Sequence, residues 1–163
     1  YRDAKITQIY EGTNGIQAMD LIGRKMPMRG GAVFADQIAR MRATLTELEA
    51  HDDLEPVLDR LAEAIDATES AGQWLMSEGM SDPVQALSVA SPFQRLFSLT
   101  AAGWLMARQA IQATEGLAAG GDEDFLTQKL VSARFFCLNL LPETQGLVAP
   151  ATSGSSDLLA AAF

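Results

Sequence analysis

The residues best suited to chemistry lie in the short run Glu11, Gly12, Thr13, Asn14 and Gly15. Glu11 brings a carboxylate, the kind of group that transfers protons when a fold positions it. Thr13 can cap a helix, and the two glycines let the backbone approach a ligand. Free N–H groups at such a helix start attract phosphate. The same pattern also fits an ordinary exposed glutamate that favours the positive end of a helix dipole.

Other reactive side chains carry weaker signals. His51 stands alone in a charged interhelical turn, with no second His or Cys spaced to complete a metal site, so a surface histidine is predicted. Cys137, the single cysteine, lies in the apolar run RFFCLNLL and is predicted to be a buried, inert thiol. The methionines at 26, 28, 76, 80 and 106 are too scattered for a copper or redox cluster.

Helical periodicity defines the elements that must position these residues. Apolar residues recur on one face from Thr13 to about Lys25, and Pro27 with the Gly30-Gly31 pair then interrupts the pattern. Two further amphipathic helices are predicted over 32–48 and 54–75, the second with candidate N-caps in the run HDD at 51–53.

The second half of the chain continues the same pattern. Asp82-Pro83 and Ser91-Pro92 each resemble a cap followed by proline, which predicts a short helix and then a long one over about 92–115. Another helix is predicted over about 124–140, followed by a turn and a last short helix in the tail. No stretch alternates with period two. The predicted fold is therefore all-α, an antiparallel bundle of about five helices preceded by a short helical arm.

Two packing expectations follow from this pattern. The small residues Ala101, Ala102 and Gly103 form a notch where another helix can approach closely. Large aromatic residues at core spacing are expected inside the bundle. These are Phe93, Phe97, Trp104, Phe125 and Phe136.

Composition excludes several classes of function. The chain has 163 residues, 48% of them hydrophobic, which is enough for a real core. Its 12 Lys and Arg stand against 21 Asp and Glu, a net charge of -9, so no nucleic-acid partner is expected. No apolar run is long enough to span a membrane, and a cytoplasmic location is expected. Because Tyr1 stands at the start, within a periodic segment, the sequence is expected to be a fragment of a longer protein.

The opening 25 residues, YRDAKITQIYEGTNGIQAMDLIGRK, resemble the C-terminal signature of acyl-CoA dehydrogenases. In that signature an Arg-Asp-Ala run leads to Tyr-Glu-Gly-Thr and then to a final helix. The segments DPVQAL, SPFQRLFSLTAAGWLMARQA and LLP resemble the extra helical module of the longer members, the 3-methylthiopropanoyl-CoA dehydrogenase type. The resemblance thus implies a boundary, with the end of a catalytic helical domain over 1–29 and a helical bundle module over 30–163.

The resemblance also implies a reaction and its residues. An acyl-CoA loses its α proton to a base and its β hydride to FAD, giving a 2-enoyl-CoA in fatty acid metabolism. Glu11 matches the base, Gly12 the substrate contact, and Thr13, Asn14 and Gly15 the FAD contacts. Many relatives carry glutamine where this chain has Gly15, and glycine offers no side chain to replace that contact.

Partners follow from the same resemblance. It implies an electron-transfer flavoprotein as the acceptor of electrons and a homo-oligomeric assembly. The catalytic residues belong to the full-length parent, so the 163-residue chain alone is expected to be inactive. The alternative is a non-catalytic helical module for interaction or oligomerisation, whose first 25 residues are a vestigial arm.

Overall fold

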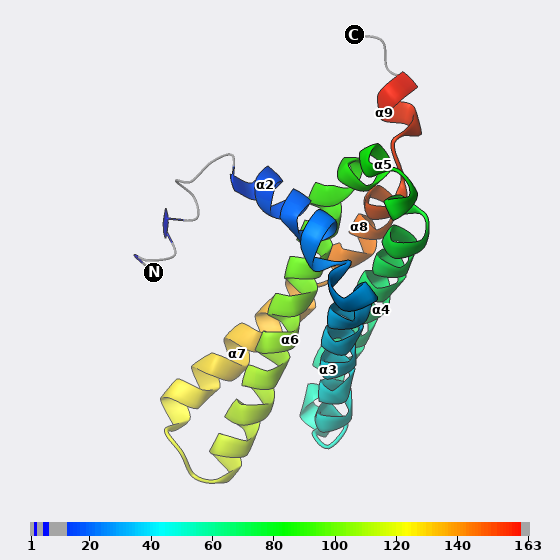
Figure 1. Cartoon of the computed structure of the whole chain (residues 1–163). Helices are drawn as coiled ribbons and strands as arrows, with labels where there is room; N and C mark the ends of the chain where they lie inside the picture. Colours follow the sequence, from blue (N-terminus) through cyan, green and yellow to red (C-terminus); the bar gives the residue numbers. More distant parts are fainter. Residues whose placement is uncertain (1, 3–4, 7–12, 161–163) are drawn as a thin grey trace.

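The computed structural model describes residues 2, 5–6 and 13–160, and this part of the chain consists of helices and the turns between them, without a strand (Figure 1). The longer elements are joined by short turns, among them a π-helical turn at Leu21–Lys25 and a 3₁₀ turn at Met28–Gly31. The α-helices are α2 (Thr13–Asp20), α3 (Ala32–Leu48), α4 (Glu55–Ser77), α5 (Pro83–Ser88), α6 (Ala90–Ala118), α7 (Glu123–Asn139), α8 (Glu143–Thr152) and α9 (Ser156–Ala160). The predicted all-α class is confirmed.

The long helices form antiparallel pairs around α6. Helices α3 and α4 run side by side in opposite directions, as do α6 and α7 (Figure 1). Helix α6 contacts α2, α3, α4, α7 and α8, which makes it the central element of the bundle. Short connections between successive helices produce this up-and-down arrangement.

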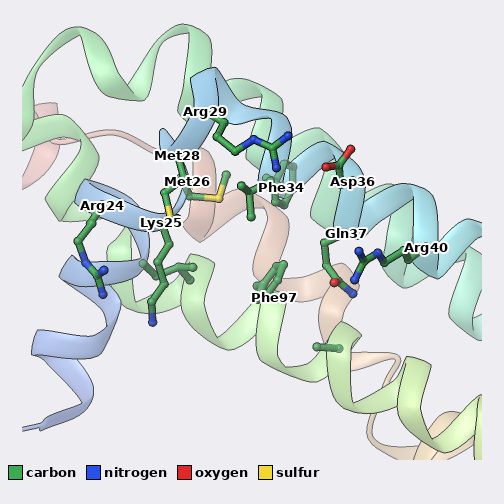
Figure 2. Close-up of a pocket in the computed structure, with 13 residues that line it drawn as sticks. Arg24, Lys25, Met26, Met28, Arg29, Phe34, Asp36, Gln37, Arg40 and Phe97 are labelled. Carbon is green, nitrogen blue, oxygen red and sulfur yellow. The ribbon is translucent and has the colours of Figure 1, made fainter.

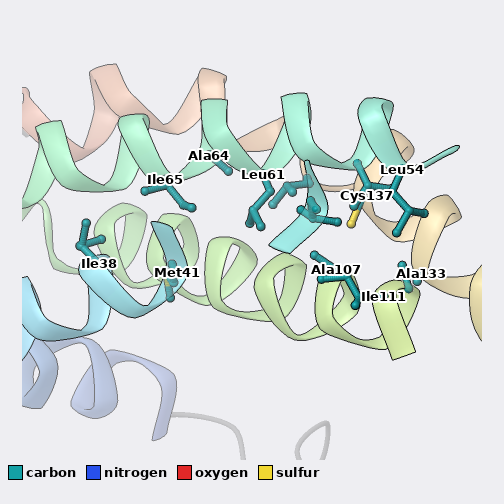
Figure 3. Close-up of a cluster of buried hydrophobic side chains, with 14 residues drawn as sticks. Ile38, Met41, Leu54, Leu61, Ala64, Ile65, Ala107, Ile111, Ala133 and Cys137 are labelled. Carbon is teal, nitrogen blue, oxygen red and sulfur yellow. The ribbon is translucent and has the colours of Figure 1, made fainter. Parts of the chain in front are cut away.

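Two clusters of buried apolar side chains hold the bundle together. The first lies between α3, α4, α6 and α7 and includes Met41, Leu61 and Ile111 (Figure 3). The second surrounds Phe93 at the other end of α6 and takes in Ala18 and Ile22 from the segment before α3. Residues of the helical arm are therefore buried against the bundle.

A small set of buried polar contacts crosses the helix interfaces. The hydroxyls of Thr68 on α4 and Thr100 on α6 lie 2.7 Å apart and are both fully buried. Trp104 on α6 donates its indole N–H to the Thr44 hydroxyl on α3 at 2.8 Å. These contacts fix the register of three helices, since a slip of one helix would leave buried hydroxyls without partners.

The predicted notch on α6 is confirmed at Gly103. A Cβ added at Gly103 would lie 2.7 Å from both terminal carbons of Leu141, which is fully buried in the turn after α7. The thiol of Cys137 also approaches the Gly103 carbonyl, with 3.8 Å between sulfur and oxygen. Glycine at this position lets the end of α7 pack directly against the α6 backbone.

Several predicted helix starts need correction. Asp82 does cap α5, accepting the Val84 N–H at 2.9 Å. Ser91 is not a cap, because α6 already begins at Ala90. The run HDD does not cap α4 either: Asp52–Leu54 form a 3₁₀ turn and α4 begins at Glu55 without a side-chain cap.

Two further expectations were wrong. No helix was predicted between Leu140 and the tail, yet α8 forms there, packs on α4 and α6 and buries Thr144. Phe125 was expected in the core but is 56% exposed in the first turn of α7, where Lys129 lies over its ring. Periodicity placed it on the correct helix, but in that turn Leu126 faces Gly116 of α6 and Phe125 is left in solvent.

Candidate functional site

The predicted site residues lie at the start of α2. Glu11 and Gly12 are outside the described residues, whereas Thr13, Asn14 and Gly15 form the first turn of the helix and are exposed. No acidic side chain lies in this first turn, and a Cβ added at Gly15 would meet nothing within 4 Å. The turn thus offers backbone N–H groups at the positive end of a helix, with open space beside it.

The rest of α2 holds this turn on the bundle. Ala18 on α2 and Ile22 in the following turn are buried against the Phe93 cluster. On the other side, Ile16 is 65% and Met19 50% exposed. Two apolar side chains thus extend from a helix that is already anchored, so α2 has a second face that can be covered by further protein.

An ion-pair cluster joins the end of α2 to the π-helical turn that follows it. Arg24 Nε lies 2.5 Å from Asp20 Oδ1, and Lys25 Nζ lies 3.1 Å from Asp20 Oδ2. The hydrogen bonds from Arg24 and then Lys25 lower the pKa of Asp20 to about 2. The bond to Asp20 in turn raises the pKa of Arg24. One carboxylate is therefore shared by two cations.

A groove of about 740 Å³ lies between this segment, the start of α3 and the face of α6 (Figure 2). Arg24, Lys25, Arg29 and Arg40 are among its lining residues, together with Phe34 and Phe97. The sequence analysis did not identify it. A signal was present, because five of the chain's 12 Lys and Arg fall within residues 21–42, a stretch with a single acidic residue.

The remaining candidates behave as structural residues. Cys137 is fully buried, as predicted, and burial raises the pKa of its thiol to about 11, so it is a poor nucleophile. His51 lies 3.7 Å from the Glu115 carboxylate and its side chain is 19% exposed, less than expected for a surface histidine. Among the residues that the structure describes, no group of acidic, His and Cys side chains could hold a metal ion.

Nothing in the described helices has the length and apolar character required to cross a membrane.

Comparison with known proteins places the chain in context. The family model described as "Acetyl-CoA dehydrogenase C-terminal like" matches residues 35–162. The 3-methylmercaptopropionyl-CoA dehydrogenase of Ruegeria pomeroyi is 36% identical over 166 residues, an alignment that covers 100% of this chain and 28% of that protein. A broad-specificity linear acyl-CoA dehydrogenase of Mycobacterium tuberculosis is 31% identical, over 86% of this chain and 24% of that protein.

A butyryl-CoA dehydrogenase of Syntrophomonas wolfei subsp. wolfei is 30% identical over 152 residues, covering 89% of this chain and 24% of that protein. The chain thus spans about a quarter of the length of the curated relatives that it matches.

Proposed function

Because the chain belongs to the acetyl-CoA dehydrogenase C-terminal like family, we propose that it is the C-terminal part of an FAD-dependent acyl-CoA dehydrogenase. The reaction proposed is removal of the α proton and β hydride of an acyl-CoA, giving a 2-enoyl-CoA. The observation that carries this proposal is the exposed turn Thr13–Gly15, which follows directly on Glu11 and Gly12 in the sequence.

The described part of this turn fits the phosphates of a dinucleotide. Its N–H groups lie at the start of a helix, no carboxylate lies in that first turn to repel an anion, and Gly15 has free space around it. Thr13, Asn14 and Gly15 are thus proposed to hold FAD. FAD, when bound, supplies the acceptor for the hydride.

Proton removal is proposed for Glu11. An α proton beside a thioester is too weakly acidic for a solvated glutamate, so the carboxylate must be positioned and the enolate oxygen stabilised by N–H donors. The backbone N–H of Glu11 is proposed as one such donor to the thioester carbonyl. Gly12, which has no side chain, leaves room for the acyl-CoA. Substrate that displaces water from the carboxylate makes it a stronger base.

The bundle itself is proposed to have a structural role. Its described residues form two packed cores and contain no catalytic constellation, and the exposed outer side of α7 carries Val131 and Phe135, 54% and 60% exposed. We propose that the module contacts the catalytic body or another subunit of a cytoplasmic homo-oligomer. An electron-transfer flavoprotein is the proposed electron acceptor.

The test uses the complete enzyme, extended upstream to include the flavin domains. Glu11→Gln keeps the size of the side chain but removes the base, so flavin reduction by acyl-CoA should slow by about 10²- to 10⁴-fold or more while FAD stays bound. Stopped-flow absorbance of the flavin measures this rate. Glu49→Gln, at the exposed end of α3, is the matched control and should leave it unchanged.

A second variant separates cofactor binding from chemistry. Thr13→Ala should weaken FAD retention more than it slows proton removal, because it changes the first turn of α2 and leaves Glu11 in place. Flavin reduction within about tenfold of wild type in Glu11→Gln would be too fast for an enzyme without its base, and would assign the base elsewhere. The 163-residue chain alone should neither retain stoichiometric FAD nor oxidise acyl-CoA, because one turn is a small part of a dinucleotide pocket.

A further inference from the structure

The groove beside α3 concentrates positive charge in an acidic protein. The chain carries a net charge of -9, yet Arg24, Lys25, Arg29 and Arg40 all line this groove, and Asp36 is the acidic residue among its lining. The cations come from both sides, with Arg24 and Lys25 on the segment after α2 and Arg40 on α3 (Figure 2). An anion placed between them would be attracted from both walls.

Half of this charge is not neutralised within the part of the chain that the structure describes. Arg24 and Lys25 share the single carboxylate of Asp20. Arg29 and Arg40 make no ion pair with any described residue, whereas Arg42, half a turn further along α3, is paired with Asp66 and Glu69. When Asp20 and Asp36 are set against the four cations, two positive charges remain.

The interior of the groove is apolar and partly aromatic. Phe34 of α3 and Phe97 of α6 have their ring centroids 6.2 Å apart, and both line the groove. Met26, buried at 2% exposure, also lines the groove, together with Met28 and Val33. A volume of about 740 Å³ is in the range of small-molecule and cofactor sites, about 300–1,000 Å³.

The backbone at Arg29 gives a second, independent observation. Arg29 has φ 53°, in the left-handed region, and is the described non-glycine residue with positive φ; Gly30 and Gly31 follow with φ 67° and 90°. A side chain in this conformation costs on the order of 1–2 kcal/mol, which glycine would avoid. Strained backbone conformations cluster at functional sites, and Arg29 is one of the residues that line this groove (Figure 2).

We propose that this groove binds a nucleoside diphosphate, with the diphosphate held by the arginines and the base against Phe34 and Phe97. Planar guanidinium groups bind phosphate oxygens in pairs, and two uncompensated positive charges match a diphosphate better than the single charge of a fatty carboxylate. The amide of Gln37 and the carboxylate of Asp36, both at the groove, offer partners for sugar hydroxyls and base edges. This inference does not depend on the proposed function of the Glu11 turn.

The experiment titrates the full 163-residue chain with ADP, followed by calorimetry and by amide chemical shifts. One ADP should bind per chain with a dissociation constant below about 1 mM. Pyrophosphate and adenosine should each bind more weakly, since each provides half of the contacts. Raising the salt from about 50 to 200 mM should weaken ADP binding, because exposed charges are screened.

Two variants and one control test the residues. Arg40→Gln and Arg29→Gly should each weaken ADP binding by about tenfold or more, the effect of losing a charge-assisted hydrogen bond. Arg29→Gly should also leave the melting temperature unchanged or raised, because glycine relieves the backbone strain. Arg60→Gln on α4, outside the groove, removes the same charge and should change affinity less than about twofold.

Three results would overturn the proposal. The first is absence of ADP binding at millimolar concentration in the folded chain. The second is equal ADP affinity in wild type, Arg29→Gly and Arg40→Gln. The third is binding of pyrophosphate as tight as ADP, or binding to phosphatidylserine vesicles without binding to ADP, because either would show that the aromatic floor does not hold a base.

Discussion

Replacing the buried threonine pair tests the packing of α4 on α6. The Thr100 hydroxyl lies 3.1 Å from the Leu96 carbonyl and 3.3 Å from the Ala64 carbonyl, so it has carbonyl acceptors for its one hydrogen. Both hydroxyl hydrogens are bonded when Thr100 donates to a carbonyl and Thr68 donates to the Thr100 hydroxyl, 2.7 Å away. Thr100→Val leaves the Thr68 donor buried without this partner, whereas Thr68→Val leaves Thr100 with its bonds to carbonyls.

The expected costs are therefore unequal. Thr100→Val should lower the free energy of unfolding by about 1–3 kcal/mol, the cost of an unsatisfied buried group, and Thr68→Val by about 0.5–1.5 kcal/mol, the net value of one hydrogen bond. The double variant replaces both partners with apolar groups of the same shape and should lie within about 1 kcal/mol of wild type. For a chain of this length each kcal/mol shifts the melting temperature by about 2–4 °C.

Circular dichroism during urea and thermal unfolding measures the free energy of unfolding of wild type, the two single variants and the double variant. The control is Thr127→Val on the exposed side of α7, which should lie within about 0.5 kcal/mol of wild type. If the double variant were destabilised by the full sum of the single variants, the two hydroxyls would not interact. The account of buried polar contacts fixing the helix register would then be refuted.

Two further predictions concern the core. A Cβ at Gly72 on α4 would overlap the Phe34 ring, so Gly72→Ala should destabilise the chain by up to about 2 kcal/mol, although alanine has the better helix propensity. A Cβ at Gly146 on α8 would meet nothing within 4 Å, so Gly146→Ala should stabilise the chain by about 0.5–1 kcal/mol. The same unfolding assay measures both variants. Burial raises the pKa of Cys137 from 9.0 to about 11, so the thiolate forms more readily in the unfolded chain than in the folded one. The contribution of this thiol to the free energy of unfolding is therefore fully present below pH 9 and is lost as the pH rises towards 11. Cys137→Ala should remove this pH dependence. A thiol reagent that modified native Cys137 as fast as the unfolded chain would contradict its burial.

Much of the helical architecture could be predicted from the sequence, because long amphipathic segments carry a strong periodic signal. The helix from Ala32 to Leu48 was predicted at its observed bounds, and Asp82 was identified as a cap. Helix α8 could not be predicted from local preference. Pro142 precedes its first residue and is tolerated there, whereas Pro150 lies inside the helix and has no N–H to donate to the Gly146 carbonyl. Packing against α4 and α6 therefore supplies the stability that its sequence lacks.

The two candidate sites, the Glu11–Gly15 run and the groove, also differ in how clearly the sequence indicates them. The run Glu11–Gly15 was predicted as a site from a contiguous motif, and the structure describes three of its five residues. The groove was missed because its cations are spread over residues 24–40 and meet only when the π-helical turn and α3 fold over α6. Local periodicity does not indicate that these cations line one groove, nor that Arg29 adopts a left-handed backbone conformation.

Helix α6 has a consequence for the spacing of surfaces. Its 29 residues extend over about 43 Å at 1.5 Å per residue, and they contribute Phe93 to one core and Ile111 to the other. The start of α6 supports α2 and its exposed turn, while its far end carries the loop to α7. Because α6 is one continuous helix packed at both ends, the tip of the α6–α7 hairpin is held tens of ångströms from the exposed turn Thr13–Gly15. Substitutions on either surface would not change that separation.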